Sequence, residues 1–114
     1  MLELEGVWII TKGIVRLFGI DAAFWLTVIL SKQERLKHNN QLNKDGYFSC
    51  LQKEIERDTT LSLDKQTKII NQLKMEGVIS VKTKGLPRKN YYKVNENILS
   101  EKLQNLNSIL DLEN

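Results

Sequence analysis

The feature that most constrains the fold of this chain is a change of periodicity at Gly77. Before this glycine, apolar residues recur at helical spacing, and after it β-branched residues alternate with polar ones. Ser62 is a suitable N-cap, so we predict a helix over Leu63–Glu76 that ends at Gly77. The inner face of this helix carries Ile69, Ile70 and Leu73. The chain must therefore pass directly from a helix into a strand.

The residues that follow the helix predict a β-hairpin. Val78–Thr83 has the composition and alternation of a strand. Lys84–Asn90 contains Gly and Pro and has turn chemistry, and Tyr91–Val94 returns as a second strand. We therefore expect two antiparallel strands here.

The alternation also predicts which side chains share a face of the hairpin. Lys82 and Lys84 should lie on one face, with Val81 on the opposite, inward face. The adjacent rings of Tyr91 and Tyr92 could stack on bases, but aromatic residues in a returning strand more often pack on the domain. We therefore expect packing, with one ring inward and one outward.

A shorter helix is predicted upstream of Ser62. Ser49 and Gln52 have the spacing of a capping box, which indicates a helix from about Cys50 to Arg57. Asp58–Leu61 then forms a tight connection to the next helix. Two helices joined by about three to four residues have the outline of a helix-turn-helix.

The N-terminal part predicts two further helices. Leu2–Ile10 alternates loosely and predicts a short strand or an arm, and Thr11–Phe18 predicts a short helix that ends at Gly19. Asp21 is a suitable N-cap for a longer helix. Its first half, Ala22–Leu30, is apolar on nearly every face, so we expect it in the core or at a subunit interface.

Between these helices and the helix-turn-helix we predict a loop over His38–Gly46 and a minimal strand at Tyr47–Phe48. The large aromatic residues of the N-terminal part, like the apolar helix, are expected in the core or at a subunit interface. They are Trp8, Phe24 and Trp25.

The chain closes with a predicted helix from about Asn97. Four leucines recur along it at spacings of four, three and four, namely Leu99, Leu103, Leu106 and Leu110. Two readings are open for this ladder: a short coiled coil between two subunits, or docking of the helix on its own domain. The segment Ala22–Leu30 is the other candidate for a subunit interface.

Positive charge is concentrated in one segment. The chain carries a net charge of +3, and residues 62–93 contain eight Lys or Arg against Asp64 and Glu76, a local balance of +6. The remainder therefore carries −3. From Gly77 to Asn95 there is no acidic residue at all. A surface lysine is most often a solvated charge, but a basic helix followed by an acid-free basic hairpin favours contact with nucleic acid.

Several classes of protein are not expected. A single cysteine, Cys50, excludes an internal disulfide and is expected to be a buried structural thiol, and the lone His38 is expected on the surface. Glu54 and Asp58 are expected to be surface charges. We predict no metal site, no cofactor, no catalytic residues and no membrane association. We also predict a cytoplasmic location and a single domain over residues 1–114.

The order of elements resembles a known fold. The segment LSLDKQTKIINQLKMEGVISVKTKGLPRKNYYKV is similar to a winged helix-turn-helix, and its Lys-Gly-Leu-Pro-Arg-Lys-Asn-Tyr-Tyr wing resembles those of phage and plasmid replication initiators and replisome organisers. The resemblance runs from about Gly13 to Val94, and Gly19-Ile20-Asp21 matches the way such domains begin. It implies an α+β, mostly helical fold: a winged helix-turn-helix over residues 13–95 with a two- or three-stranded antiparallel wing, and an extra C-terminal helix over residues 96–114, a possible dimerisation element.

The resemblance also implies roles for individual residues. In such domains the second helix of the motif enters the major groove and the wing follows the neighbouring backbone or minor groove. The recognition-helix residues expected to face DNA are Asp64, Lys65, Thr67, Lys68, Asn71 and Gln72. Lys can reach guanine, and Asn and Gln can pair with adenine, so this helix has chemistry able to specify bases. The wing residues expected to contact phosphates are Lys82, Lys84, Arg88, Lys89 and Lys93.

We therefore expect a sequence-specific double-stranded DNA-binding protein of a phage, plasmid or other mobile element that acts in replication initiation or its control. A transcriptional repressor or a partition adaptor that binds repeated sites is the alternative. A winged-helix protein-interaction module without DNA binding is a further one. A homodimer is expected because a single small winged helix reads few base pairs, and a replication or regulatory protein is a further possible partner.

Overall fold

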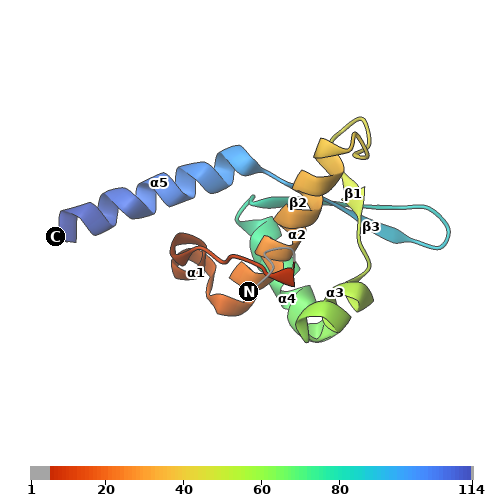
Figure 1. Cartoon of the computed structure of the whole chain (residues 1–114), viewed down its shortest axis with the longest axis horizontal. Coiled ribbons are helices and arrows are strands. Elements are labelled where there is room, and N and C mark those ends of the chain that lie inside the picture. Colours follow the sequence, from red (N-terminus) through yellow and green to blue (C-terminus); the bar gives the residue numbers. More distant parts are fainter. Residues whose placement is uncertain (1–5, 114) are drawn as a thin grey trace.

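The computed structural model describes residues 6–113, which form five helices and one three-stranded antiparallel sheet. In chain order the elements are α1 (Lys12–Phe18), α2 (Ile20–His38), β1 (Phe48–Ser49), α3 (Gln52–Thr59), α4 (Leu63–Met75), β2 (Ile79–Lys84), β3 (Lys89–Val94) and α5 (Glu96–Glu113) (Figure 1). The expectation of an α+β, mostly helical fold is confirmed. The strand or arm predicted over Leu2–Ile10 begins outside the described residues, and residues 7–10 form neither helix nor strand.

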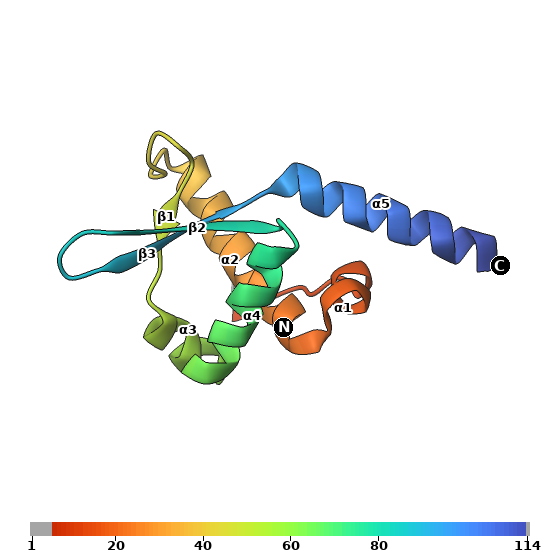
Figure 2. The ribbon, with the colours of Figure 1, turned by 180° about the vertical axis from the view of Figure 1, so that it is seen from behind.

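The sheet has the strand order β1-β3-β2, so the hairpin predicted from the sequence is extended by the short strand β1. Phe48 pairs with Tyr92 and Ser49 with Tyr91 across β1 and β3. Figures 1 and 2 show the hairpin tip and α5 projecting from opposite ends of the molecule, with α2, α3 and α4 between them.

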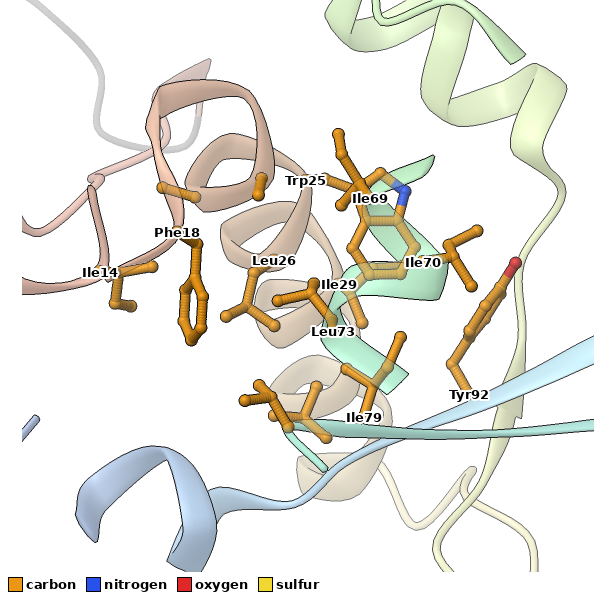
Figure 3. Close-up of a cluster of buried hydrophobic side chains, with 14 of the residues drawn as sticks. Ile14, Phe18, Trp25, Leu26, Ile29, Ile69, Ile70, Leu73, Ile79 and Tyr92 are labelled. Atoms are coloured by element: carbon orange, nitrogen blue, oxygen red, sulfur yellow. The ribbon is translucent and has the colours of Figure 1, made fainter. Parts of the chain in front are cut away.

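Helix α2 passes through the centre of the core. Trp25, Leu26 and Ile29 are completely buried, as the apolar run predicted. The Trp25 ring meets Tyr92 of β3 edge to face, with ring centroids 5.6 Å apart, and this contact joins the helices to the sheet (Figure 3). Trp8, in contrast, is 39% exposed and packs its ring against Phe24, so it is not a core residue.

Two predicted caps are wrong. Asp21 lies in the first turn of α2, which begins at Ile20, because Gly19 alone makes the corner between α1 and α2 at a φ of 86°. Ser49 does not cap α3: it belongs to β1, where it pairs with Tyr91, and α3 begins only at Gln52 with Leu51 as its N-cap. In both cases a neighbouring element determines where the helix begins.

The predicted limits of α4 are confirmed to within one residue. The Ser62 side chain accepts a hydrogen bond from the backbone N–H of Lys65 at 3.2 Å. At the other end Gly77 has a φ of 74°, its N–H donates to the Lys74 carbonyl, and the N–H of Val78 donates to the Leu73 carbonyl. This pair of bonds is the Schellman arrangement, which turns the chain from the helix into β2.

The first half of α5 docks on its own domain. Leu99 is buried in the core, and Leu103 packs against the core beside Gly13. A Cβ atom at position 13 would lie only 2.8 Å from the Leu103 side chain, so this contact needs a glycine there. Further along, Leu106 and Leu110 are only half-buried, and the helix runs out from the body of the molecule (Figure 1). The leucine ladder is therefore divided: its first two members are occupied by their own domain.

Candidate nucleic-acid interface

Helix α4 divides cleanly into a buried and an exposed face. The buried residues are Gln66, Ile69, Ile70 and Leu73. All six residues predicted for the recognition helix are exposed, namely Asp64, Lys65, Thr67, Lys68, Asn71 and Gln72. The helix thus presents lysine, asparagine and glutamine side chains together to solvent.

One of these lysines has an acidic partner. The Lys65 ammonium lies 3.2 Å from the Asp21 carboxylate, and both side chains are about half exposed. An ion pair this exposed contributes little to stability, so a competing anion can displace it. Within residues 6–113, no carboxylate lies within salt-bridge distance of Lys68.

A shallow groove runs beside these lysines. It has a volume of about 280 Å³ and lies between α4 and the corner where α1 meets α2. Its walls include Lys65, Lys68 and Gln72 from α4, and Gly19 and Asp21 from the corner. The groove leaves the polar flank of α4 accessible from the side.

A buried glutamine holds α4 in place. The Gln66 side-chain amide donates to the carbonyls of Gln52 and Leu61, both at 2.9 Å, and its oxygen accepts from the Trp25 indole N–H at 3.4 Å. The side chain is 0% exposed, so all its hydrogen bonds are made within the protein. Gln66 therefore fixes α4 against α2 and α3 and so sets the direction of its exposed face.

The hairpin register confirms the predicted alternation. Lys82 pairs with Tyr91, and Val81 with Tyr92, so the two pairs lie on opposite faces of the sheet. Tyr92 is completely buried and Tyr91 is half-buried, as expected for one inward and one outward ring. Four lysines share the outer face, namely Lys82, Lys84, Lys89 and Lys93.

The lysines of the hairpin do not all have the same surroundings. Lys82 lies 3.5 Å from the Asp45 carboxylate and 4.3 Å from the centre of the Tyr47 ring. Arg88 and Lys89, at the tip, are exposed, and no salt bridge within the described part of the chain involves either. The tip is therefore the part of the hairpin with the most available positive charge.

Two side chains anchor the base of the hairpin. Gln33 of α2 is 6% exposed, and its oxygen accepts a hydrogen bond from the Val94 N–H at 2.8 Å. Asn95 donates to the Gly77 carbonyl at 2.8 Å and to the Ser80 hydroxyl at 3.1 Å, which joins the start of β2 to the end of β3. Both hold the hairpin in a fixed position relative to α4.

The sequence predictions included neither Gln66 nor these two anchors. A signal was present for both glutamines. Gln66 lies three residues before Ile69, and Gln33 four residues after Ile29, so each continues the apolar stripe of its helix. A polar residue on an apolar stripe indicates a buried hydrogen-bonding role.

The remaining singled-out residues show little chemistry. Cys50 is buried, as predicted, and this burial raises the pKa of its thiol. His38 is exposed, and Asp58 makes only an exposed contact with Arg57. No group of three or more potential metal ligands occurs among residues 6–113, and none of the helices described there is both long and apolar enough to cross a membrane.

Comparison with known proteins adds no assignment: no protein-family model, no curated protein and no solved structure matches this chain.

Proposed function

We propose that this protein is a sequence-specific double-stranded DNA-binding protein with a winged helix-turn-helix fold. The observation that carries the proposal is the exposed Lys, Asn and Gln face of α4 together with the acid-free hairpin that follows it directly. The element order α2-β1-α3-α4-β2-β3, with the three residues 60–62 between α3 and α4, agrees with that fold. We assign the chain a binding role and no catalytic one.

In this proposal α4 enters the major groove. Lys68 can donate to guanine O6 and N7, and Asn71 and Gln72 can each bond bidentately to adenine. Lys65 exchanges its exposed ion pair with Asp21 for a phosphate or a base edge. Sequence preference then comes from α4.

The wing supplies affinity in this proposal. Arg88 and Lys89 at its tip contact phosphates, which neutralises backbone charge and releases counterions. Gln33 and Asn95 keep the hairpin, and hence the tip, at a fixed distance from α4. The spacing between base and phosphate contacts is thereby set by the fold.

We further propose that the chain binds as a homodimer through the distal half of α5. Leu106 and Leu110 are half-buried, Ile109 is 55% exposed, and this part of the helix extends beyond the domain (Figure 2). Pairing two such helices would cover these side chains and place two recognition helices on repeated half-sites.

For the biological process, the resemblance of the wing supports a role at the replication origin of a phage or plasmid. Selection of bound fragments from the source replicon, followed by footprinting, tests the proposal. We expect repeated protected sites inside an origin. A palindrome over a promoter would indicate a repressor instead, and a centromere-like array a partition adaptor. No bound duplex, even at low salt, would contradict DNA binding and favour a protein-interaction module.

Base reading by α4 has its own test. Lys68→Ala and Gln72→Ala should each lower the ratio of specific to nonspecific affinity by about 1 to 3 kcal/mol if the side chain contacts a base. Lys12→Ala, on α1, is the matched control and should leave this ratio unchanged. An equal loss on all sequences would show that α4 touches only the backbone.

A further inference from the structure

The outer face of the sheet combines two tyrosine rings with three lysines. These residues are Tyr47, just before β1, and Lys82, Lys84, Tyr91 and Lys93, and we call them the tyrosine–lysine face. The register places Lys82 directly opposite Tyr91, and Lys93 two residues further along the same strand and face. The face points away from Tyr92 and the core, and the duplex contacts of α4 make no use of its tyrosines.

The lysines lie over the rings. The ammonium of Lys82 is 4.3 Å and that of Lys93 5.8 Å from the centre of Tyr47, and Lys84 is 6.0 Å from the centre of Tyr91. These distances are those of cation–π pairs. Positive charge and aromatic surface therefore alternate over a short distance.

The backbone of Tyr47 is held by the loop that carries it. The Asn43 side-chain oxygen accepts hydrogen bonds from the N–H groups of Asp45 and Tyr47, at 3.1 and 2.8 Å. The backbone N–H of Asn43 donates to the Tyr47 carbonyl at 3.1 Å, and that of Gly46 to the Asn43 carbonyl at 3.0 Å. These four bonds fix the backbone from which the Tyr47 ring projects.

A hollow of about 370 Å³ opens beside the two rings. Tyr47 and Tyr91 both line it. The other lining residues are apolar Leu36 and Phe48 and polar Gln41, Asn43 and Ser49. Aromatic walls with a few hydrogen-bonding groups suit a flat heteroaromatic ring. Phosphates attached to such a ring would lie among the lysines.

We propose that the tyrosine–lysine face binds single-stranded DNA, with unpaired bases on Tyr47 and Tyr91 and phosphates on Lys82, Lys84 and Lys93. The faces of bases inside a duplex are covered by their neighbours, whereas every unpaired base offers a free face. Stacking on an aromatic residue strengthens binding by about fivefold or more per base, so it can replace the weaker exposed contact between an ammonium and the ring. The lysines released from the rings move to the phosphates.

One acidic side chain lies beside this face and competes with a phosphate for a lysine. Asp45 pairs with Lys82 at 3.5 Å and is exposed, so the strand must displace this contact. Lys84 and Lys93, for which no salt bridge is found within residues 6–113, leave the face with excess positive charge. The recognition of an unpaired strand stands on this geometry alone. The choice of DNA over RNA rests on the proposed function, because a protein bound at an origin lies beside the strand that opens there.

The test compares a strand that has bases with one that lacks them. An oligothymidylate of about 12 nucleotides, within the usual site size, and an abasic strand of equal length and charge are titrated with the full chain in fluorescence anisotropy at about 50 mM salt. We expect the thymidylate to bind about 30-fold more tightly, from two stacked bases. Equal affinity for the two strands would overturn the proposal, as would a clear preference for an oligouridylate.

Variants then locate the stacking. Tyr47→Leu with Tyr91→Leu should remove the thymidylate preference, while Tyr47→Phe with Tyr91→Phe should keep it, because only the rings are needed. Unchanged preference in the leucine pair would overturn the proposal. If that pair unfolds, photocrosslinking of 5-iodouracil DNA to the wild-type chain gives the answer: adducts at Tyr47 or Tyr91 support it and adducts elsewhere contradict it. The leucine pair should bind a duplex that contains the specific site as tightly as the wild type does. A failure of the duplex proposal would therefore appear in the duplex titration, and a failure of the single-strand proposal in the thymidylate titration.

Discussion

Replacing Gln66 by leucine tests how the orientation of α4 is maintained. Leucine is similar to glutamine in size, so Gln66→Leu fills the same space but removes three hydrogen bonds. The change leaves the Trp25 indole N–H and the Leu61 carbonyl without partners inside the protein. The Gln52 carbonyl also loses one donor, in a partly exposed position where water can replace it.

The magnitude follows from the burial of these groups. An orphaned buried polar group costs about 1 to 3 kcal/mol. The bond to Trp25 is long, at 3.4 Å, and the Gln52 carbonyl can be hydrated, so both belong at the low end of this range. The bond to Leu61, at 2.9 Å, belongs higher. We expect a loss of about 3 kcal/mol in the free energy of unfolding, or about 12 °C in Tm for a chain of this size.

Urea denaturation followed by circular dichroism measures this loss. Gln72→Leu makes the same substitution on the exposed face of the same helix and should change stability by less than about 0.5 kcal/mol. A loss below about 1 kcal/mol for Gln66→Leu would refute the reasoning, because the network would then not be fixing α4.

Three further predictions concern α5 and the buried titratable groups. Leu106→Asp combined with Leu110→Asp should give a monomer in sedimentation with little change in stability, and an unchanged dimer mass would move the interface elsewhere. Leu99→Ala should cost about 2 to 4 kcal/mol in urea denaturation because this side chain is in the core, whereas Leu110→Ala should cost far less; equal costs would contradict the docking of the first half of α5. Burial raises the pKa of the Cys50 thiol and of the Tyr92 hydroxyl, so at alkaline pH the unfolded chain releases protons that the folded chain retains. The free energy of unfolding should therefore fall as the pH rises above the ordinary thiol pKa, and a flat profile up to about pH 10.5 would contradict this.

Local signals predicted much of the fold. Ser62 and Gly77 mark the two ends of α4 because a cap and a left-handed glycine act within a few residues of themselves. The hairpin faces followed from the alternation of β2 and β3 alone. These features depend on near neighbours in sequence, so the sequence contains what is needed to predict them.

Two of the features that the sequence did not predict arise where distant segments meet. Ser49 has a good capping pattern, but its backbone pairs with Tyr91, and the sheet determines the start of α3. Leu99 and Leu103 could not be divided from the rest of the ladder, because both dock on distant parts of the chain and Leu103 needs the space left by Gly13.

The same limit applies to the candidate interface. The exposure of its predicted residues follows from helical and strand periodicity. The ion pair between Lys65 and Asp21 and the contact of Lys82 with Tyr47 join residues more than 30 positions apart. No spacing rule reaches so far, and the tyrosine–lysine face is visible only once β1 pairs with β3.

The central claim is that α4 and the wing bind duplex DNA, and the salt dependence of that binding tests it most directly. For a protein that neutralises Z phosphates, the logarithm of the association constant falls with the logarithm of salt concentration at a slope of about −0.9Z. Arg88→Ala with Lys89→Ala should reduce the steepness by about two units, whereas Lys12→Ala on α1 should leave it unchanged. A wild-type slope near zero, or a tip double variant with the wild-type slope, would contradict the account.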